Sequence, residues 1–168
     1  MRKRKEIDKM EALGKLESLC ARSEQCVFDL NRKMINWGIK ASDRKEIIEN
    51  LIENRYVDES RYARSFANDK ARFSCWGPYK IRMELMKKRL MSSLISEAVK
   101  NVDPEVWKEG LLHAATVKAR NLDLTGEDGW ENGQKLYKYL IGRGFPSAAS
   151  SKAVNVMRKR EESSGEKA

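Results

Sequence analysis

Residues 78–102, PYKIRMELMKKRLMSSLISEAVKNV, decide the fold. Within them Ile81 and Leu85 stand four positions apart, which places both on one face of a helix. We place a turn at Arg89, four positions further on. Apolar residues then resume at helical spacing at Ala98, Val99 and Val102. The stretch therefore predicts two short amphipathic helices joined by a turn.

The same pattern occurs twice more, centred on Gly38 and Gly144, where glycine adopts a left-handed turn easily. The centres Gly38, Arg89 and Gly144 are 51 and 55 residues apart. Six apolar columns agree, at eight and four positions before each centre and at one, nine, ten and thirteen after it. Their residues are Leu30, Ile81, Leu136; Met34, Leu85, Leu140; Ile39, Leu90, Phe145; Ile47, Ala98, Ala153; Ile48, Val99, Val154; and Leu51, Val102, Met157. A third apolar helix precedes each pair, so the unit is three helices.

These units predict an all-α fold: three tandem three-helix repeats, helix-turn-helix-like, stacked into an elongated, curved body. An apolar fraction of 40% beside a charged fraction of 35% gives a thin core, which suits that shape. The segments we assign are a basic N-terminal arm (1–10), repeat 1 (11–56), repeat 2 (57–102), repeat 3 (103–160) with an inserted loop (123–129), and a frayed polar tail (161–168).

Acidic residues mark three expected helix starts. Asp103 precedes Pro104, a cap followed by proline at the first helical position. Asp58 is expected to cap the next helix, and Asp43 with Glu46 three residues later resembles a capping box. The sequence therefore predicts helices that begin just after each of these aspartates.

The totals narrow the function. Lys and Arg number 34 against 25 Asp and Glu, a net charge of +9, which favours anionic partners. Three cysteines without C-x-x-C spacing predict reduced thiols in the cytoplasm, and neither a disulfide framework nor a zinc site. No run of 18 apolar residues exists, so no membrane span is expected.

Nothing in the sequence indicates an enzyme. The single histidine, His113, stands between leucines and alanines and is expected to be a packed or half-exposed helix residue. No phosphate-binding loop, nucleophile motif or metal cluster is present, so we expect neither a cofactor nor a metal.

Positive charge concentrates between residues 70 and 89, where Glu84 is the one acid. The basic residues there are Lys70, Arg72, Lys80, Arg82, Lys87, Lys88 and Arg89. One continuous patch could neutralise phosphates or meet an acidic protein surface, and a merely solvated helix face stays open. The aromatic neighbours Phe73, Trp76 and Tyr79 could stack on bases, but packing at a helix end is preferred.

A run of specific residues adds a resemblance. The residues that carry it include Tyr56, Asp58, Arg61, Tyr62, Ala63, Phe66, Ile81 and Leu85. Over residues 54–102, and more weakly over 15–160, the chain resembles the RecX family of bacterial RecA regulators. Helical spacing makes most of these residues core, with Asp58 a cap; Arg61 could equally pair with an acid or face a partner. Arg89, where glycine is usual, and Cys26, where a serine cap is usual, depart from the family pattern.

The resemblance implies tandem three-helix repeats that bind in the groove of the RecA filament. It implies inhibition of strand exchange, ATP hydrolysis and co-protease activity, with direct binding of single- or double-stranded DNA in some members. We therefore expect a monomeric regulator of the RecA filament in recombination and the SOS response. The alternative is a sequence-independent or transcription-factor-like DNA-binding protein.

Overall fold

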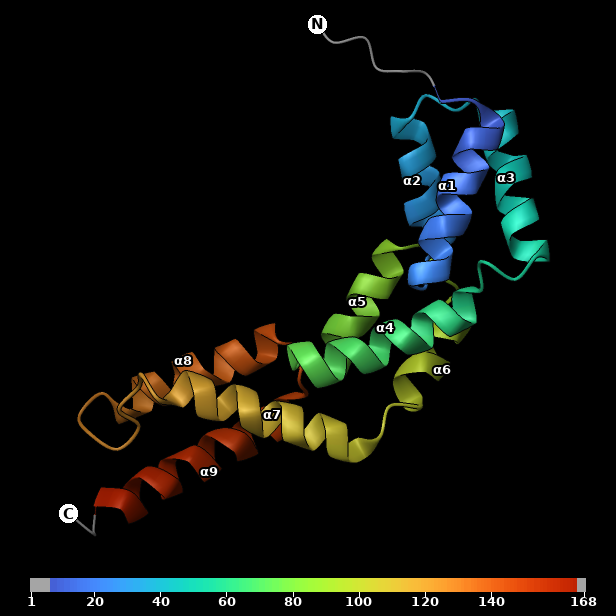
Figure 1. The fold of residues 1–168 in the computed structure, drawn as a ribbon. Coiled ribbons are helices and arrows are strands. Elements are labelled where there is room, and N and C mark those ends of the chain that lie inside the picture. The colour runs from blue at the N-terminus through green and yellow to red at the C-terminus, as the bar shows by residue number, and fades with distance from the viewer. Residues whose placement is uncertain (1–6, 166–168) are drawn as a thin grey trace, which may run out of the picture.

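The structure is a computed structural model that describes residues 7–165 (Figure 1). That part of the chain is all α-helix and turns, without strands. The helices are α1 (Lys9–Arg22), α2 (Val27–Asn36), α3 (Ala41–Glu53), α4 (Glu59–Ser74), α5 (Pro78–Lys87), α6 (Ser92–Lys100), α7 (Pro104–Ala119), α8 (Gly129–Gly142) and α9 (Ser147–Gly165). The predicted all-α fold is confirmed.

The buried apolar residues form three clusters, one for each successive group of three helices. Of the eighteen residues in the six predicted columns, seventeen are buried, and Ile48 is half-buried against the first cluster. The clusters are not fully separate, because Cys26 of the first group and Val106 of the third belong to the middle cluster. The residue limits of the three repeats remain a prediction.

All three turn centres have a positive φ, as the repeat predicts. The angles are 80° at Gly38, 59° at Arg89 and 89° at Gly144. In the first and third turns the next amide, of Ile39 or Phe145, donates to the carbonyl five residues back. The three turns therefore share one left-handed geometry, which only Arg89 adopts with a side chain present.

Two of the three expected helix caps are confirmed. The Asp58 carboxylate accepts from the Arg61 amide at 2.9 Å, and that of Asp103 from the Glu105 amide at 2.9 Å. The prediction for Asp43 is wrong, because α3 begins two residues earlier and Lys40 precedes it. Asp43 lies inside the first turn of α3, where its negative charge interacts favourably with the positive end of the helix dipole without capping it. Cys26 precedes α2 without a side-chain cap.

The two chain ends differ from the expected arm and tail. Residues 1–6 of the predicted arm lie outside the described residues, and α1 begins inside the arm, capped by Asp8. The predicted fraying of the tail is wrong for residues 161–165, which continue α9. Glu161 explains part of this, because its carboxylate accepts the Leu124 amide at 3.0 Å and ties α9 to the inserted loop. Residues 166–168 lie outside the described residues.

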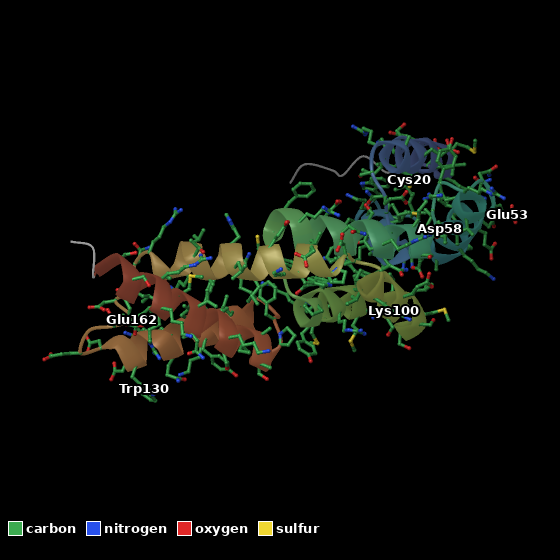
Figure 2. All side chains as sticks on the ribbon, turned by 90° about the horizontal axis from the view of Figure 1, so that it is seen from below. Cys20, Glu53, Asp58, Lys100, Trp130 and Glu162 are labelled. Atoms are coloured by element: carbon green, nitrogen blue, oxygen red, sulfur yellow. The ribbon has the colours of Figure 1, made fainter. Side chains whose placement is uncertain are left out.

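The molecule is elongated and bent, with α1–α3 at one end and α8 and α9 at the other (Figure 1). It stays long in the perpendicular view, where Glu53 and Glu162 lie near opposite ends (Figure 2). The accessible surface is 11193 Å², whereas a compact protein of this size exposes about 8,500 Å². The chain therefore presents an unusually large surface for its length.

The two joints between the helix groups are built differently. At the α5–α8 joint the Gly77 amide donates to the Arg143 carbonyl at 2.7 Å, and the Tyr79 amide to the Gly144 carbonyl at 3.0 Å. Among the described residues no backbone–backbone hydrogen bond joins α1–α3 to α4–α6. Side chains make that first joint.

Candidate functional site

The residues that carry the family resemblance build the core and its first joint. Tyr62, Ala63, Ile81 and Leu85 are buried in the middle cluster, and Phe66 packs against it. Tyr56 packs against the first cluster, and Asp58 caps α4. Most of this motif therefore holds the fold in place and leaves little for a partner to touch.

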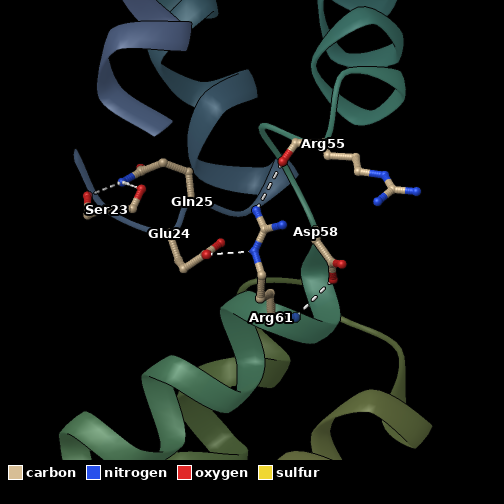
Figure 3. Close-up of polar contacts among 6 residues, drawn as sticks. All are labelled: Ser23, Glu24, Gln25, Arg55, Asp58 and Arg61. Atoms are coloured by element: carbon tan, nitrogen blue, oxygen red, sulfur yellow. Dashed lines mark hydrogen bonds and ion pairs between the residues drawn. The ribbon is translucent and has the colours of Figure 1, made fainter. Parts of the chain in front are cut away.

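Arg61 spans the first joint (Figure 3). Its Nε lies 2.6 Å from Glu24 Oε1, and its terminal nitrogen donates to the Arg55 carbonyl at 3.2 Å. The hydrogen bond to Glu24 raises the pKa of the Arg61 guanidinium. Arg61 thus pairs with an acid, one of the two roles left open, and fixes the linker between α3 and α4 against the segment before α2.

The C-terminal end of α5 takes part in the same joint. Lys88 Nζ lies 2.7 Å from Asp29 Oδ2, with both side chains about three-quarters buried. The Arg89 guanidinium lies 5.4 Å from the Phe28 ring centroid. Burial raises the pKa of the Cys26 thiol and of the Tyr62 hydroxyl beside it. Lys88 and Arg89 are therefore occupied with α2.

Two basic residues of the predicted set come together around one aromatic ring. Lys70 Nζ lies 5.1 Å and Lys80 Nζ 4.5 Å from the Trp76 ring centroid. Trp76 in turn packs edge-on against Phe66, with centroids 6.4 Å apart. We call this group of three, Lys70, Trp76 and Lys80, the Trp76 cluster. Among the described residues neither lysine forms an ion pair with a carboxylate.

The seven basic residues do not form one continuous patch. Arg72 follows Lys70 by two residues and so points about 160° away around α4, where it lines a pocket with His113. Arg82 is displaced from Lys80 on α5 in the same way and donates to Ser96 at 3.2 Å. Lys87, two turns after Lys80, shares its side of α5 but pairs with Glu84 at 2.7 Å.

The aromatic residues divide as well. Trp76 is half-buried and packed, as preferred from the sequence, but that preference is wrong for Phe73 and Tyr79, which are 81% and 59% exposed. Each lies on the face of its helix opposite the buried residues, so its ring points to solvent. The exposed rings do not belong to the Trp76 cluster.

Arg143 is a cation that the sequence reading missed. Its guanidinium donates to the carbonyls of Ser74 and Cys75, which end α4, and it lies 5.8 Å from the Tyr139 ring centroid. The Arg143 carbonyl accepts the Gly77 amide, so this residue joins α8 to the segment beside the Trp76 cluster. The sequence feature that could have pointed to Arg143 is its position, one residue before the turn centre Gly144.

The Trp76 cluster can bind anions. Two ammonium groups without carboxylate partners can neutralise phosphates or meet acidic side chains, and a partly accessible indole between them offers a stacking surface. In the described part of the chain no three His, Cys, Asp or Glu residues are grouped to hold a metal ion. No helix among the described residues is long and apolar enough to span a membrane.

Comparison with known proteins places residues 58–99 in the family described as "RecX, second three-helix domain". The chain is 34% identical over 111 residues to the regulatory protein RecX of Clostridium botulinum strain Alaska E43, which covers 64% of the chain and 51% of that relative. It is 27% identical over 127 residues to the one from Vibrio parahaemolyticus, covering 76% of the chain and 79% of the relative. The chain spans about half the length of the relatives from Clostridium botulinum and Clostridium beijerinckii.

Two solved structures share the fold. The match to the crystal structure of a regulatory protein RecX covers 91% of this chain and 72% of the RecX chain, with a TM-score of 0.74 and 23% identity. RecX from Lactobacillus salivarius matches 89% of the chain and 96% of its own, with a TM-score of 0.72 and 17% identity. At these identities the likeness concerns the arrangement of the helices.

Proposed function

Because the chain belongs to the RecX family, we propose that it regulates a RecA recombinase by binding the recombinase filament on DNA. In this proposal it acts in the cytoplasm as a monomer and catalyses no reaction itself. Bound along the filament, it inhibits strand exchange, ATP hydrolysis and the co-protease activity.

The observation that carries this proposal is the long, bent shape, with α4 and α5 near its middle (Figure 1). These two helices carry Lys70 and Lys80 of the Trp76 cluster. A body of this shape can lie along a groove and contact several protomers in succession. Lys70 and Lys80 then face phosphates or acidic side chains, and the bulk of α4–α6 excludes the incoming DNA strand. Inhibition is steric, and it follows from preferential binding to the filament over its free components.

The test uses the full chain, RecA filaments on single-stranded DNA, and the variant Lys70→Glu/Lys80→Glu. We expect the wild type to slow ATP hydrolysis and strand exchange, and the double reversal to weaken both effects at least about tenfold, since it replaces two attractions by two repulsions. The matched control is Lys33→Glu/Lys100→Glu, which reverses two exposed lysines elsewhere and is expected to inhibit like the wild type.

A second candidate is a DNA-binding protein without a recombinase partner, which the indole between two lysines favours. Gel shifts against random and defined duplexes and single strands separate the two. Equal binding to bare DNA and to filament, with unchanged ATP turnover, would reject the recombinase proposal and leave the second candidate.

A further inference from the structure

A groove with an apolar lining runs between α7 and α9, and none of the three residues of the Trp76 cluster belongs to its lining. Its volume is about 600 Å³, within the usual range of ligand sites. Trp107 and Leu111 of α7 form one wall and Ala149 and Val156 of α9 the other. The lining also includes Pro78, Pro104 and Pro146, which stand at or beside helix starts.

The fold leaves the apolar surface of this groove uncovered. Phe145 and Ala153 at its floor are buried, but Trp107 and Leu111 are half-buried, and Val156 is 38% exposed. Apolar side chains gathered in a concave surface bind a partner more often than they stay in water. The groove therefore suits a ligand with apolar groups.

The rim of the groove is positive. Lys108, Lys152 and Arg160 belong to its lining, which includes no acidic residue. Lys108 makes a 3.2 Å contact with Glu105, in which both side chains are 66% exposed, so this pairing is weak. Among the described residues Lys152 and Arg160 form no ion pair. A ligand that fits must therefore carry negative charge beside its apolar groups.

We propose that this α7–α9 groove binds an amphipathic, acidic segment of a protein partner. Apolar side chains of the segment, spaced as on one helix face, fill the space between Trp107 and Val156. Its Asp or Glu side chains reach Lys152 and Arg160 at the rim. The site is independent of the proposed contact through Lys70 and Lys80, and neither proposal needs the other.

The lining favours a peptide over the other occupants. Nucleic bases need aromatic surfaces to stack on, and this groove offers Trp107 among aliphatic and proline side chains. A second copy docked symmetrically would bring two sets of Lys152 and Arg160 together and repel itself. An acidic segment meets both the apolar floor and the charge.

The test measures binding of the full chain to a fluorescein-labelled, 16-residue helical peptide. The peptide carries Leu at positions i, i+3, i+4 and i+7, Glu at four positions beside them and Ala at the rest, and its matched counterpart carries Lys in place of every Glu. We expect the Glu peptide to bind in fluorescence anisotropy, more weakly at high salt, and the Lys peptide to bind at least tenfold more weakly. Equal affinities would overturn the proposal.

Variants locate the binding. Val156→Asp places a carboxylate in the groove and should weaken binding of the Glu peptide at least tenfold. Lys152→Glu/Arg160→Glu changes only exposed side chains, so it tests the rim even if Val156→Asp fails to fold. The control Lys135→Glu/Lys138→Glu makes the same charge change on exposed residues of α8 and should bind as the wild type does.

Three other outcomes reject the acidic segment. Unchanged peptide binding by both groove variants would place the peptide elsewhere. Tighter direct binding of a labelled single-stranded oligonucleotide than of the Glu peptide, lost in both groove variants, would assign the groove to nucleic acid. Dimerisation that Val156→Asp abolishes would assign it to a second copy. None of these measurements includes the recombinase, so failure here leaves the proposed function standing.

Discussion

At the scale of single residues, Arg89 is where three similar turns differ. Gly38 and Gly144 hold the left-handed conformation without a side chain, whereas Arg89 holds it at φ 59° and rests its guanidinium near Phe28. The left-handed region costs a residue with a Cβ about 1 kcal/mol relative to glycine. The middle turn thus gives up stability locally and gains a contact across the first joint.

Glycine at position 89 should relieve this backbone strain. We expect Arg89→Gly to have a free energy of unfolding about 1 kcal/mol above that of Arg89→Ala, because both lose the Phe28 contact and only the alanine keeps the strain. Urea unfolding measures the difference. Gly38→Ala is the reverse experiment: nothing lies within 4 Å of the added Cβ, so backbone strain alone should cost about 1 kcal/mol. A more stable Arg89→Ala would contradict this reading.

Cys26 and Tyr62 predict a response to alkaline pH. Burial raises the pKa of both groups above their ordinary values of 9.0 and 10.0, so the unfolded chain releases these protons first. The folded state then binds more protons than the unfolded one, and stability must fall as pH rises above about 9. Urea midpoints between pH 7 and 10.5 should show this decline, and Cys26→Ala/Tyr62→Phe should flatten it. An unchanged slope in the double variant would assign the decline to other groups.

At the scale of elements, the α5–α8 joint depends on two glycines, each of which closely approaches the backbone on the other side of the joint. A Cβ on Gly77 would stand 2.3 Å from the Gly144 carbonyl carbon, and one on Gly144 2.3 Å from the Lys80 nitrogen. No rotamer change relieves a clash between backbone atoms. Substitution must therefore open the joint and break the hydrogen bonds of Gly77 and Tyr79 across it.

We expect Gly77→Ala to lower the free energy of unfolding by more than about 2 kcal/mol, because it combines a steric clash with lost hydrogen bonds. Gly142→Ala is the matched control on α8, where nothing lies within 4 Å and alanine favours the helix by up to about 1 kcal/mol. Thermal unfolding of the two variants compares them directly. Equal stability would mean that the joint tolerates the added methyl group.

The elements also show what the sequence can and cannot predict. Apolar spacing located the cores, since a helix must bury its apolar stripe whatever its partner is. It could not locate the charges, because Lys88 meets Asp29 only through the packing of α5 on α2, 59 residues away in the chain. It also could not separate the groove from the core, since Val156 and Ala153 read alike until α7 and α9 are placed.

At the scale of the whole molecule, the large surface predicts an extended particle in solution. A compact chain of 168 residues has a radius of gyration of about 15 Å. We expect small-angle scattering to give a value several ångströms higher, with a long-tailed distance distribution and a monomeric mass by light scattering. A value near 15 Å for the monomer would contradict the stacked arrangement of the three helix groups.

The unlike construction of the two joints has a mechanical consequence. Backbone hydrogen bonds at Gly77 hold α4–α6 against α7–α9, so the part of the chain from α4 to α9 should move as one rigid body. The first three helices are held by Arg61–Glu24, Lys88–Asp29 and the contacts around Phe28, which high ionic strength loosens. When the molecule bends to follow the curvature of a helical filament, the hinge therefore lies between α3 and α4.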